Sequence, residues 1–156
     1  MTTVSILGLG LIGGSIAKAL KNSDFPVFIS AFDKKEILQA ALKEKTIDKS
    51  LNSIDESLES EIIILAFPIS YSLSTFEYLI PRLSKKTIIT DVCGVKGVFE
   101  NKWNEIKSSG LYLGGHPMTG KEKGGYSNSD PLLFENSVYI LSDKRKEIIP
   151  GKFITL

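Results

Sequence analysis

The chain has 156 residues, 42% hydrophobic and 24% charged, a length and composition that suit one soluble globular domain. Its 19 basic and 18 acidic side chains nearly cancel, which excludes the concentrated positive charge that binds nucleic acid or an anionic membrane. A single cysteine, Cys93, excludes an internal disulfide and a cysteine-based zinc site, so no metal is expected. No apolar run approaches the roughly 20 residues of a membrane helix, and no signal pattern opens the chain. A cytoplasmic protein is expected.

Short runs rich in Val, Ile and Phe alternate with helical stretches along the chain. Continuously apolar runs such as "IIILAF" are typical of strands buried on both faces of a parallel sheet. Strand, helix and strand in succession predict right-handed crossovers, and therefore an α/β fold with a doubly wound, mostly parallel sheet. The predicted strands are 4–9, 27–32, 62–67, 87–92, 111–114 and 138–141, and the predicted helices are 12–21, 35–45, 70–83 and 95–108.

The end of the chain has a different character. Residues 143–156 are first charged and then interrupted by Pro150 and Gly151. We therefore expect one domain over residues 1–142, followed by a tail or the remnant of a linker over residues 143–156.

A glycine-rich turn follows the first predicted strand and opens the first predicted helix. It has the pattern G-x-G-x-x-G, in which Gly8 permits a tight turn, Gly10 lets a pyrophosphate approach the backbone and Gly13 lets the helix pack closely. This position predicts a Rossmann-type dinucleotide-binding domain, with a glycine turn that binds no nucleotide as the alternative. The cofactor contacts expected in the turn are Gly8, Leu9, Gly10, Leu11, Ile12 and Gly13.

The second predicted strand ends at Asp33, about 20 residues after Gly13. A carboxylate there accepts hydrogen bonds from the ribose hydroxyls of the adenosine and repels a 2′-phosphate, which favours NAD. Lys34 and Lys35 follow at once and could neutralise a phosphate, so NADP stays open. An ordinary turn aspartate is the structural alternative.

Two further strand ends carry candidate contacts. At the end of "LAFP", Pro68 turns the chain out of the sheet, and Ala66, Phe67 and Pro68 are expected to border the dinucleotide, with a purely structural turn at Pro68 as the alternative. At the end of "TDVCGVKG", Gly94 gives the backbone freedom to pass near a ligand, and Cys93 is more typical of a small buried residue than of a nucleophile. The residues expected at the edge of the site there are Asp91, Cys93, Gly94 and Lys96.

His116, in "GGHPMTG", is the only histidine in the chain. A lone histidine is usually a satisfied or solvent-facing residue. This one follows a predicted strand at the same edge as the other candidate contacts. A neutral imidazole there can take a proton from a substrate hydroxyl as hydride leaves the adjacent carbon. We therefore predict that His116 is a catalytic base.

Over roughly residues 3 to 142 the chain resembles the prephenate and arogenate dehydrogenases of tyrosine biosynthesis. The likeness rests on "ILGLGLIGGSIAKAL", "AFD", "LAFP", "DVCGVKG" and above all "GGHPMTGKEKGGYSNSDPLLFENSVYIL". The resemblance implies an NAD- or NADP-dependent enzyme with a Rossmann domain and a helical dimerisation domain. Its reaction oxidises the ring carbinol of prephenate or arogenate and releases carbon dioxide, which leaves an aromatic product.

The resemblance also implies roles for individual residues. His116 corresponds to the histidine that receives the proton of the ring hydroxyl. Thr119 and Lys121 are placed to meet substrate carboxylates, and Glu122 to tie the loop to other charges. The family commonly has a serine where this chain has Gly94, and that serine helps to hold the substrate hydroxyl and the histidine.

The helical domain of the family is not recognisable in this sequence. We therefore expect the chain to bind dinucleotide but to oxidise prephenate poorly by itself, with dimerisation or aggregation through an uncovered apolar face. Two other interpretations stay open. One is a non-catalytic dinucleotide-binding module. The other is a dehydrogenase of the β-hydroxyacid type, which usually depends on a lysine in a later helical domain and does not account for the histidine loop.

Overall fold

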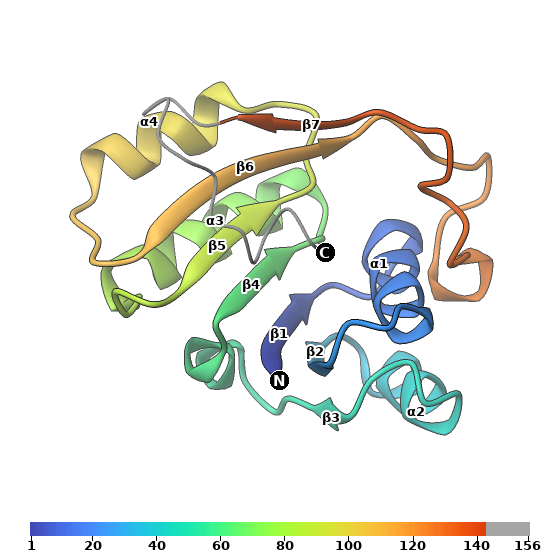
Figure 1. Cartoon of the computed structure of the whole chain (residues 1–156). Coiled ribbons are helices and arrows are strands. Elements are labelled where there is room, and N and C mark those ends of the chain that lie inside the picture. Colours follow the sequence, from blue (N-terminus) through green and yellow to red (C-terminus); the bar gives the residue numbers. More distant parts are fainter. Residues whose placement is uncertain (143–156) are drawn as a thin grey trace.

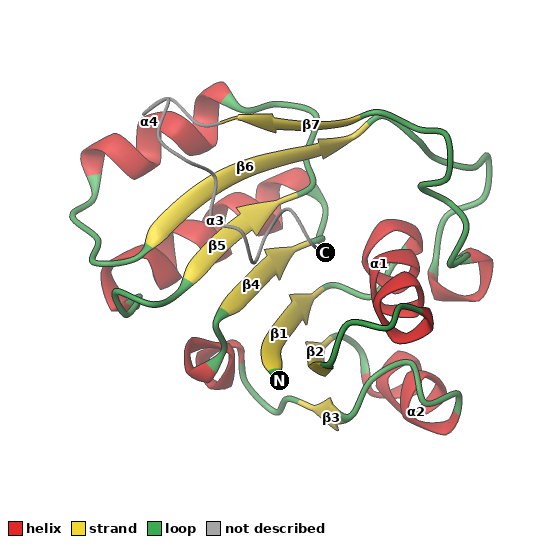
Figure 2. Ribbon diagram, viewed as in Figure 1, coloured by secondary structure: helices red, strands yellow, loops and turns green. Residues whose placement is uncertain are grey.

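Strands and helices alternate along residues 1–142, which are the residues that this computed structural model describes (Figures 1 and 2). The strands are β1 (Thr2–Leu7), β2 (Val27–Phe32), β3 (Lys49–Ser50), β4 (Ile62–Leu65), β5 (Ile88–Asp91), β6 (Leu111–Pro117) and β7 (Tyr139–Ser142). The α-helices are α1 (Leu11–Asn22), α2 (Lys35–Lys43), α3 (Ile69–Leu79) and α4 (Gly97–Glu105), and three short 3-10 turns are η1 (Ile54–Glu59), η2 (Ile80–Arg82) and η3 (Tyr126–Asn128). The predicted tail lies outside the described residues.

The strands form one seven-stranded sheet in the order β3-β2-β1-β4-β5-β6-β7. Neighbouring strands from β3 to β6 are parallel, and β7 pairs antiparallel with β6. From β1 the chain first proceeds to β2 at one side and then returns to β4 at the other. This reversal creates a switch point, where the loops after adjacent strands diverge and leave room for a ligand. The predicted doubly wound, mostly parallel sheet is confirmed.

Helices cover both faces of the sheet, with α1 and α2 on one side and α3 and α4 on the other (Figure 1). The strand β4 shows why its sequence is continuously apolar. Ile62 and Ile64 belong to the hydrophobic core under α1 and α2, whereas Ile63 and Leu65 belong to the core under α3 and α4. All four side chains are buried, since a strand in the middle of such a sheet has no face toward water.

The boundaries differ from the predicted ones where prolines and glycines occur. The strand β6 continues to Pro117 instead of ending at residue 114, because its last residues pair with β7. The helix α3 ends at Leu79, and Pro81 lies in the tighter turn η2 that follows it. The short strand β3 and the turn η1 were not predicted, since neither has a clear apolar period. Within residues 1–142, no helix is long and apolar enough to cross a membrane.

Candidate functional site

The carboxyl ends of β1, β2, β4, β5 and β6 meet at one edge of the sheet, because these strands are parallel (Figure 1). The residues expected in the site lie near these ends, within the last residues of a strand or directly after it, or in the loop after β6. The fold therefore brings the predicted cofactor residues, His116 and the residues after it to the same edge.

The glycine turn between β1 and α1 has three glycines with different surroundings. Gly8 adopts a φ of +104°, and a Cβ there would lie 2.7 Å from the carbonyl carbon of Ala66. A Cβ on Gly13 would lie 1.9 Å from the carbonyl oxygen of Gly8. A Cβ on Gly10 would meet nothing within 4 Å. Gly8 and Gly13 are thus required by the fold, whereas Gly10 borders open space that a ligand can use.

The helix α1 begins at Leu11 directly after this turn. Its first turn has no acidic side chain, and Gly10 at its N-cap offers no side-chain hydrogen bond. The first N–H groups of a helix lack partners within the helix and carry the positive end of its dipole. These groups can therefore bind a pyrophosphate beside Gly10, with Leu11 and Ile12 at the opening of the helix.

Asp33 joins the end of β2 to the glycine turn. Its Oδ2 accepts a hydrogen bond of 2.6 Å from the N–H of Leu9, and its Oδ1 accepts one of 2.6 Å from the N–H of Lys34. The side chain of Leu9 is fully buried in the core, and its N–H is bonded to Asp33, so Leu9 holds the glycine turn in a fixed position. A carboxylate oxygen accepts more than one hydrogen bond, so Asp33 can still receive a ribose hydroxyl.

The end of β4 lies beside the same turn. Ala66 provides the backbone against which Gly8 and Gly13 pack. The ring of Phe67 lies 4.4 Å from that of Tyr71 and 6.4 Å from that of Phe32, measured between centroids. Pro68 is exposed and is the N-cap residue of α3. The predicted contacts Ala66, Phe67 and Pro68 thus form one wall of the switch point.

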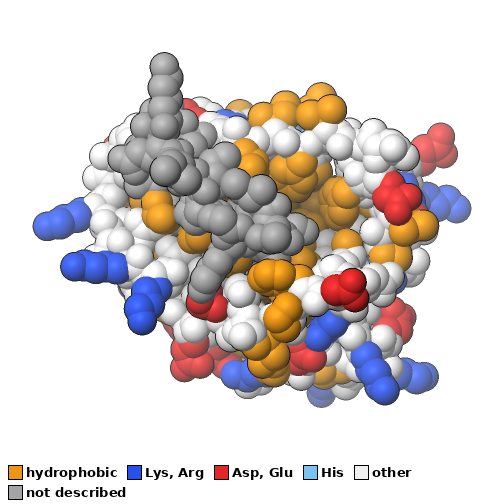
Figure 3. Space-filling view, in the orientation of Figure 1, with side chains coloured by type: hydrophobic (Ala, Val, Ile, Leu, Met, Phe, Trp, Pro, Cys, Tyr) orange, Lys and Arg blue, Asp and Glu red, His pale blue; other side chains and the backbone are white. Residues whose placement is uncertain are grey.

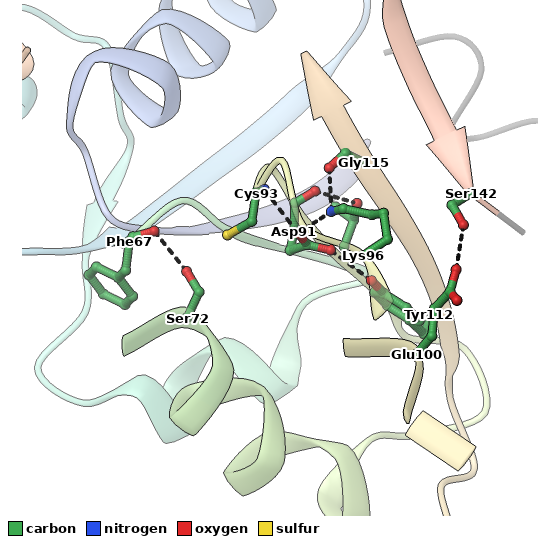
Figure 4. Close-up of polar contacts among 10 residues, drawn as sticks. Phe67, Ser72, Asp91, Cys93, Lys96, Glu100, Tyr112, Gly115 and Ser142 are labelled. Carbon is green, nitrogen blue, oxygen red and sulfur yellow. Dashed lines mark hydrogen bonds and ion pairs between the residues drawn. The ribbon is translucent and has the colours of Figure 1, made fainter. Parts of the chain in front are cut away.

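The end of β5 carries a buried polar cluster, drawn in Figure 4. Asp91 has no exposed surface and accepts hydrogen bonds from the N–H of Cys93 at 2.9 Å and from the hydroxyl of Tyr112 at 2.8 Å. Lys96 forms an ion pair with the same carboxylate. Burial and the negative charge of Asp91 raise the pKa of the Tyr112 hydroxyl and that of the Cys93 thiol above their usual values. Cys93 is therefore a protonated buried thiol, as the sequence suggested.

His116 lies in β6 rather than after it, and it pairs with Ile140 of β7. Its side chain is half-buried. A Cβ built on Gly94 would lie 3.3 Å from both Cε1 and Nε2 of the ring, so the imidazole packs directly over this glycine. Both residues were expected at the edge of the site, and the fold brings them into contact.

The proposed substrate residues lie in the loop after β6. The hydroxyl of Thr119 donates to the carbonyl of Leu133 at 3.0 Å, and Lys121 forms an ion pair of 2.8 Å with Asp130. Glu122 is exposed. All three residues lie in the loop after β6, and their roles in substrate binding stay predictions.

Sequence reasoning missed how this loop is attached to the rest of the domain. The hydroxyl of Tyr126 donates to Glu44 at 2.9 Å and accepts the hydroxyl proton of Thr46 at 3.0 Å, at the C-terminal end of α2. The N–H of Asp130 donates to the hydroxyl of Ser15 in α1 at 2.9 Å. These partners are too distant in the chain for any local pattern to reveal them. These hydrogen bonds hold the loop after β6 against the end of α2 and against α1, the helix that follows the glycine turn.

The site has the features of a Rossmann-type dinucleotide-binding domain. These are a switch point, a glycine turn with open space over Gly10, an uncapped helix start and Asp33 at the end of β2. Within residues 1–142, no group of three or more His, Cys, Asp or Glu side chains is arranged to hold a metal ion. Residues 16–149 match the family described as "Prephenate dehydrogenase, nucleotide-binding domain", and the chain belongs to this family.

Individual relatives agree with this assignment. The chain is 34% identical to the prephenate dehydrogenase of Lactococcus lactis over 100% of its own length and 47% of that protein, and 35% identical to that of Bacillus subtilis over 92% and 40%. The structure of prephenate dehydrogenase from Aquifex aeolicus aligns with a TM-score of 0.85 at 30% identity, over 99% of this chain and 56% of that one. Synechocystis arogenate dehydrogenase aligns with a TM-score of 0.80 at 26% identity, over 99% and 54%. The chain thus spans about half the length of the curated relatives it matches.

Proposed function

We propose that this chain binds NAD across its glycine turn and takes part, through His116, in the oxidative decarboxylation of prephenate or arogenate that leads to tyrosine. The observation that carries the proposal is the position of His116 at the same sheet edge as the glycine turn. A further structure of the Aquifex aeolicus prephenate dehydrogenase, which aligns with a TM-score of 0.80 at 31% identity, was determined with hydroxyphenyl propionate and NAD+.

The residues of the site fit a dinucleotide. The open space over Gly10 and the free N–H groups of α1 suit a pyrophosphate, and Asp33 suits the ribose of the adenosine. The negative charge of Asp33 favours NAD over NADP, while the adjacent Lys34 keeps NADP as the alternative. When bound, NAD supplies the acceptor for the hydride that leaves the substrate carbon.

The protein supplies position and one base. In the proposed reaction, the ring hydroxyl gives its proton to a nitrogen of His116 as hydride leaves the same carbon. Loss of carbon dioxide then makes the ring aromatic. Thr119 and Lys121 are proposed to hold substrate carboxylates and Glu122 to order their loop. Gly94 offers His116 no side-chain hydrogen bond, which distinguishes this site from the family pattern that has a serine there.

A second function is a dinucleotide-binding module that does not itself catalyse oxidation. It is favoured by Gly94, which leaves His116 without the hydroxyl that the family pattern provides.

Location and assembly follow from the same proposal. We infer a cytoplasmic enzyme, because its cofactor and substrates are soluble metabolites. We also infer self-association, since an apolar hollow of about 530 Å³ opens between α1 and β7 (Figure 3). It is lined in part by Ile16 and Leu20 of α1, Ile64 of β4, and Tyr139 and Leu141 of β7.

Calorimetric titration tests the proposal directly. The chain is titrated with NAD and, separately, with NADP, and each mixture then receives prephenate or arogenate while reduced cofactor is followed by absorbance. We expect NAD to bind more tightly than NADP. Substrate-dependent NADH formation that disappears in a His116→Gln variant supports the enzyme, and NAD binding without turnover supports the module. A chain that binds neither nucleotide contradicts both.

A further inference from the structure

Asp91 is a charged side chain in a place that excludes water. It ends β5 and has no exposed surface. A buried carboxylate is costly unless donors and an opposite charge surround it. Here both oxygens are used, because Oδ1 accepts the N–H of Cys93 and the ammonium of Lys96, and Oδ2 accepts the hydroxyl of Tyr112 (Figure 4).

Lys96 has a second partner that the ion pair alone does not require. Its ammonium donates to the carbonyl of Gly115 at 2.6 Å. Gly115 is the residue before His116 in β6. The stem of Lys96 is enclosed, with 17% of its side chain exposed, and the ammonium lies 5.5 Å from the centre of the Phe99 ring. Lys96 is therefore held in one place, and from there it holds the backbone next to the histidine.

The same carboxylate also holds the loop on which the imidazole packs. The N–H of Cys93 donates to Asp91, and Cys93 is the residue before Gly94. His116 and Gly94, which contact each other, thus each follow a residue that is bonded to the Asp91–Lys96 pair. The Asp91–Lys96 pair therefore holds both Gly94 and His116 in place relative to each other.

Gly114 and Gly115, the two residues before His116, lack the side chains that would collide with this cluster. A Cβ on Gly114 would lie 2.9 Å from the hydroxyl of Tyr112 and 3.0 Å from Cδ of Lys96. A Cβ on Gly115 would lie 2.6 Å from the carbonyl oxygen of Asp91. Side chains at these positions would push the cluster and the strand apart. The two glycines of "GGHP" therefore make room for the buried cluster.

We infer that Lys96 is a positioning residue for His116. Through Asp91 on one side and the carbonyl of Gly115 on the other, it sets the distance between the imidazole and the Gly94 loop. The inference deepens the proposed function, because it rests on His116 as the base of that reaction. Lys96 itself is not required to touch the substrate or the cofactor for this role.

The test uses the fact that the 156-residue chain contains one histidine. Its imidazole gives a single set of NMR signals, and the nuclear Overhauser effect between Hε1 of His116 and the α-protons of Gly94 reports their contact. The variants are Lys96→Met and the double variant Asp91→Asn/Lys96→Met, in which no buried charge is left unpaired. Lys102→Met is the matched control, since Lys102 of α4 forms exposed ion pairs with Glu77 of α3 and Glu105 of α4.

We expect the wild type and Lys102→Met to show the Overhauser effect. We expect every folded Lys96 variant to lose it, with a shifted imidazole signal. A folded Lys96 variant that is less stable but keeps the Overhauser effect shows a merely structural role and overturns the inference. If both variants unfold, the pair is a condition of folding, which also overturns it. Titration of the wild type with NAD followed by prephenate decides the proposed function separately, because the NMR result needs no nucleotide.

Discussion

The imidazole of His116 packs over Gly94, where a Cβ would lie 3.3 Å from both Cε1 and Nε2. A side chain at this position therefore meets the ring directly. Introduction of a serine at position 94 places a hydroxyl within reach of the imidazole, and the ring must yield by only a few tenths of an ångström. The contact thus offers a direct way to test what the missing hydroxyl contributes.

We expect Gly94→Ser to raise substrate-dependent NADH formation by about fivefold, since one hydrogen bond contributes about 1 kcal/mol. Gly94→Ala is the control, because it adds the same Cβ without a hydroxyl. Initial rates at saturating NAD measure the effect. Equal rates for the serine and alanine variants would show that the hydroxyl contributes nothing here.

Two alanine substitutions in the glycine turn should separate binding from folding. Gly10→Ala should leave the free energy of unfolding nearly unchanged, because nothing lies within 4 Å of its Cβ, and should weaken NAD binding by at least about tenfold. Gly13→Ala should destabilise the domain by about 3 kcal/mol, since its Cβ would lie 1.9 Å from the carbonyl oxygen of Gly8.

The measurements are urea unfolding and calorimetric titration with NAD. Gly120→Ala is the control, because its Cβ also meets nothing within 4 Å, and it should change neither quantity. Unimpaired NAD binding by Gly10→Ala would contradict a pyrophosphate site at this turn.

Asp33→Asn should shift the preference from NAD toward NADP. An amide oxygen can still accept the N–H of Leu9, so the glycine turn keeps its anchor, while the negative charge near a 2′-phosphate is removed. We expect the ratio of the NADP to the NAD dissociation constant to fall by about tenfold. Titration of the wild type and of Asp33→Asn with both nucleotides measures it. An unchanged ratio would assign Asp33 a purely structural role.

The domain should lose stability in alkaline solution, because the contribution of Tyr126 disappears as its hydroxyl ionises. Burial is the main cause that raises the pKa of Tyr126 to about 12, and the charge of Glu44 adds to it. The hydroxyl is therefore still protonated in the folded chain at a pH where the unfolded chain has lost the proton. Its contribution to stability is complete below about pH 10 and is lost as the pH rises toward about 12.

Urea unfolding at a series of pH values tests this. Tyr126→Phe should cost about 1 kcal/mol at neutral pH, because the hydrogen bonds to Glu44 and Thr46 are lost. Its stability should then fall less steeply than that of the wild type between about pH 10 and pH 12. Parallel curves would contradict the raised pKa.

Local patterns predicted much of the fold. The continuous apolar run of β4 indicated a strand with two buried faces, and the turn after β1 indicated the start of a dinucleotide-binding domain. The spacing from Gly13 to Asp33 pointed to a carboxylate that lies against the glycine turn, and its contact with the ribose stays a prediction. These features depend on residues close together in the chain, and local sequence is informative about them.

The partners of Asp91 could not be predicted in the same way. Tyr112 reaches Asp91 because β5 and β6 pair with Asp91 opposite Gly114, and no local pattern specifies that register. The extent of β6 was predicted too short for a related reason. Gly115 and Pro117 are typical strand breakers, but here β7 pairs with them from the open side of the sheet.

The hydrogen bond from Leu9 to Asp33 is made entirely by protein atoms. The shape of the glycine turn is therefore determined when the chain folds, and the entropy of ordering it is lost at that stage and not on association. A nucleotide that arrives at this edge meets a surface already in its receptive form. Association should then be governed by diffusion and charge, and the affinity should reflect contacts that are not offset by reorganisation of the loop.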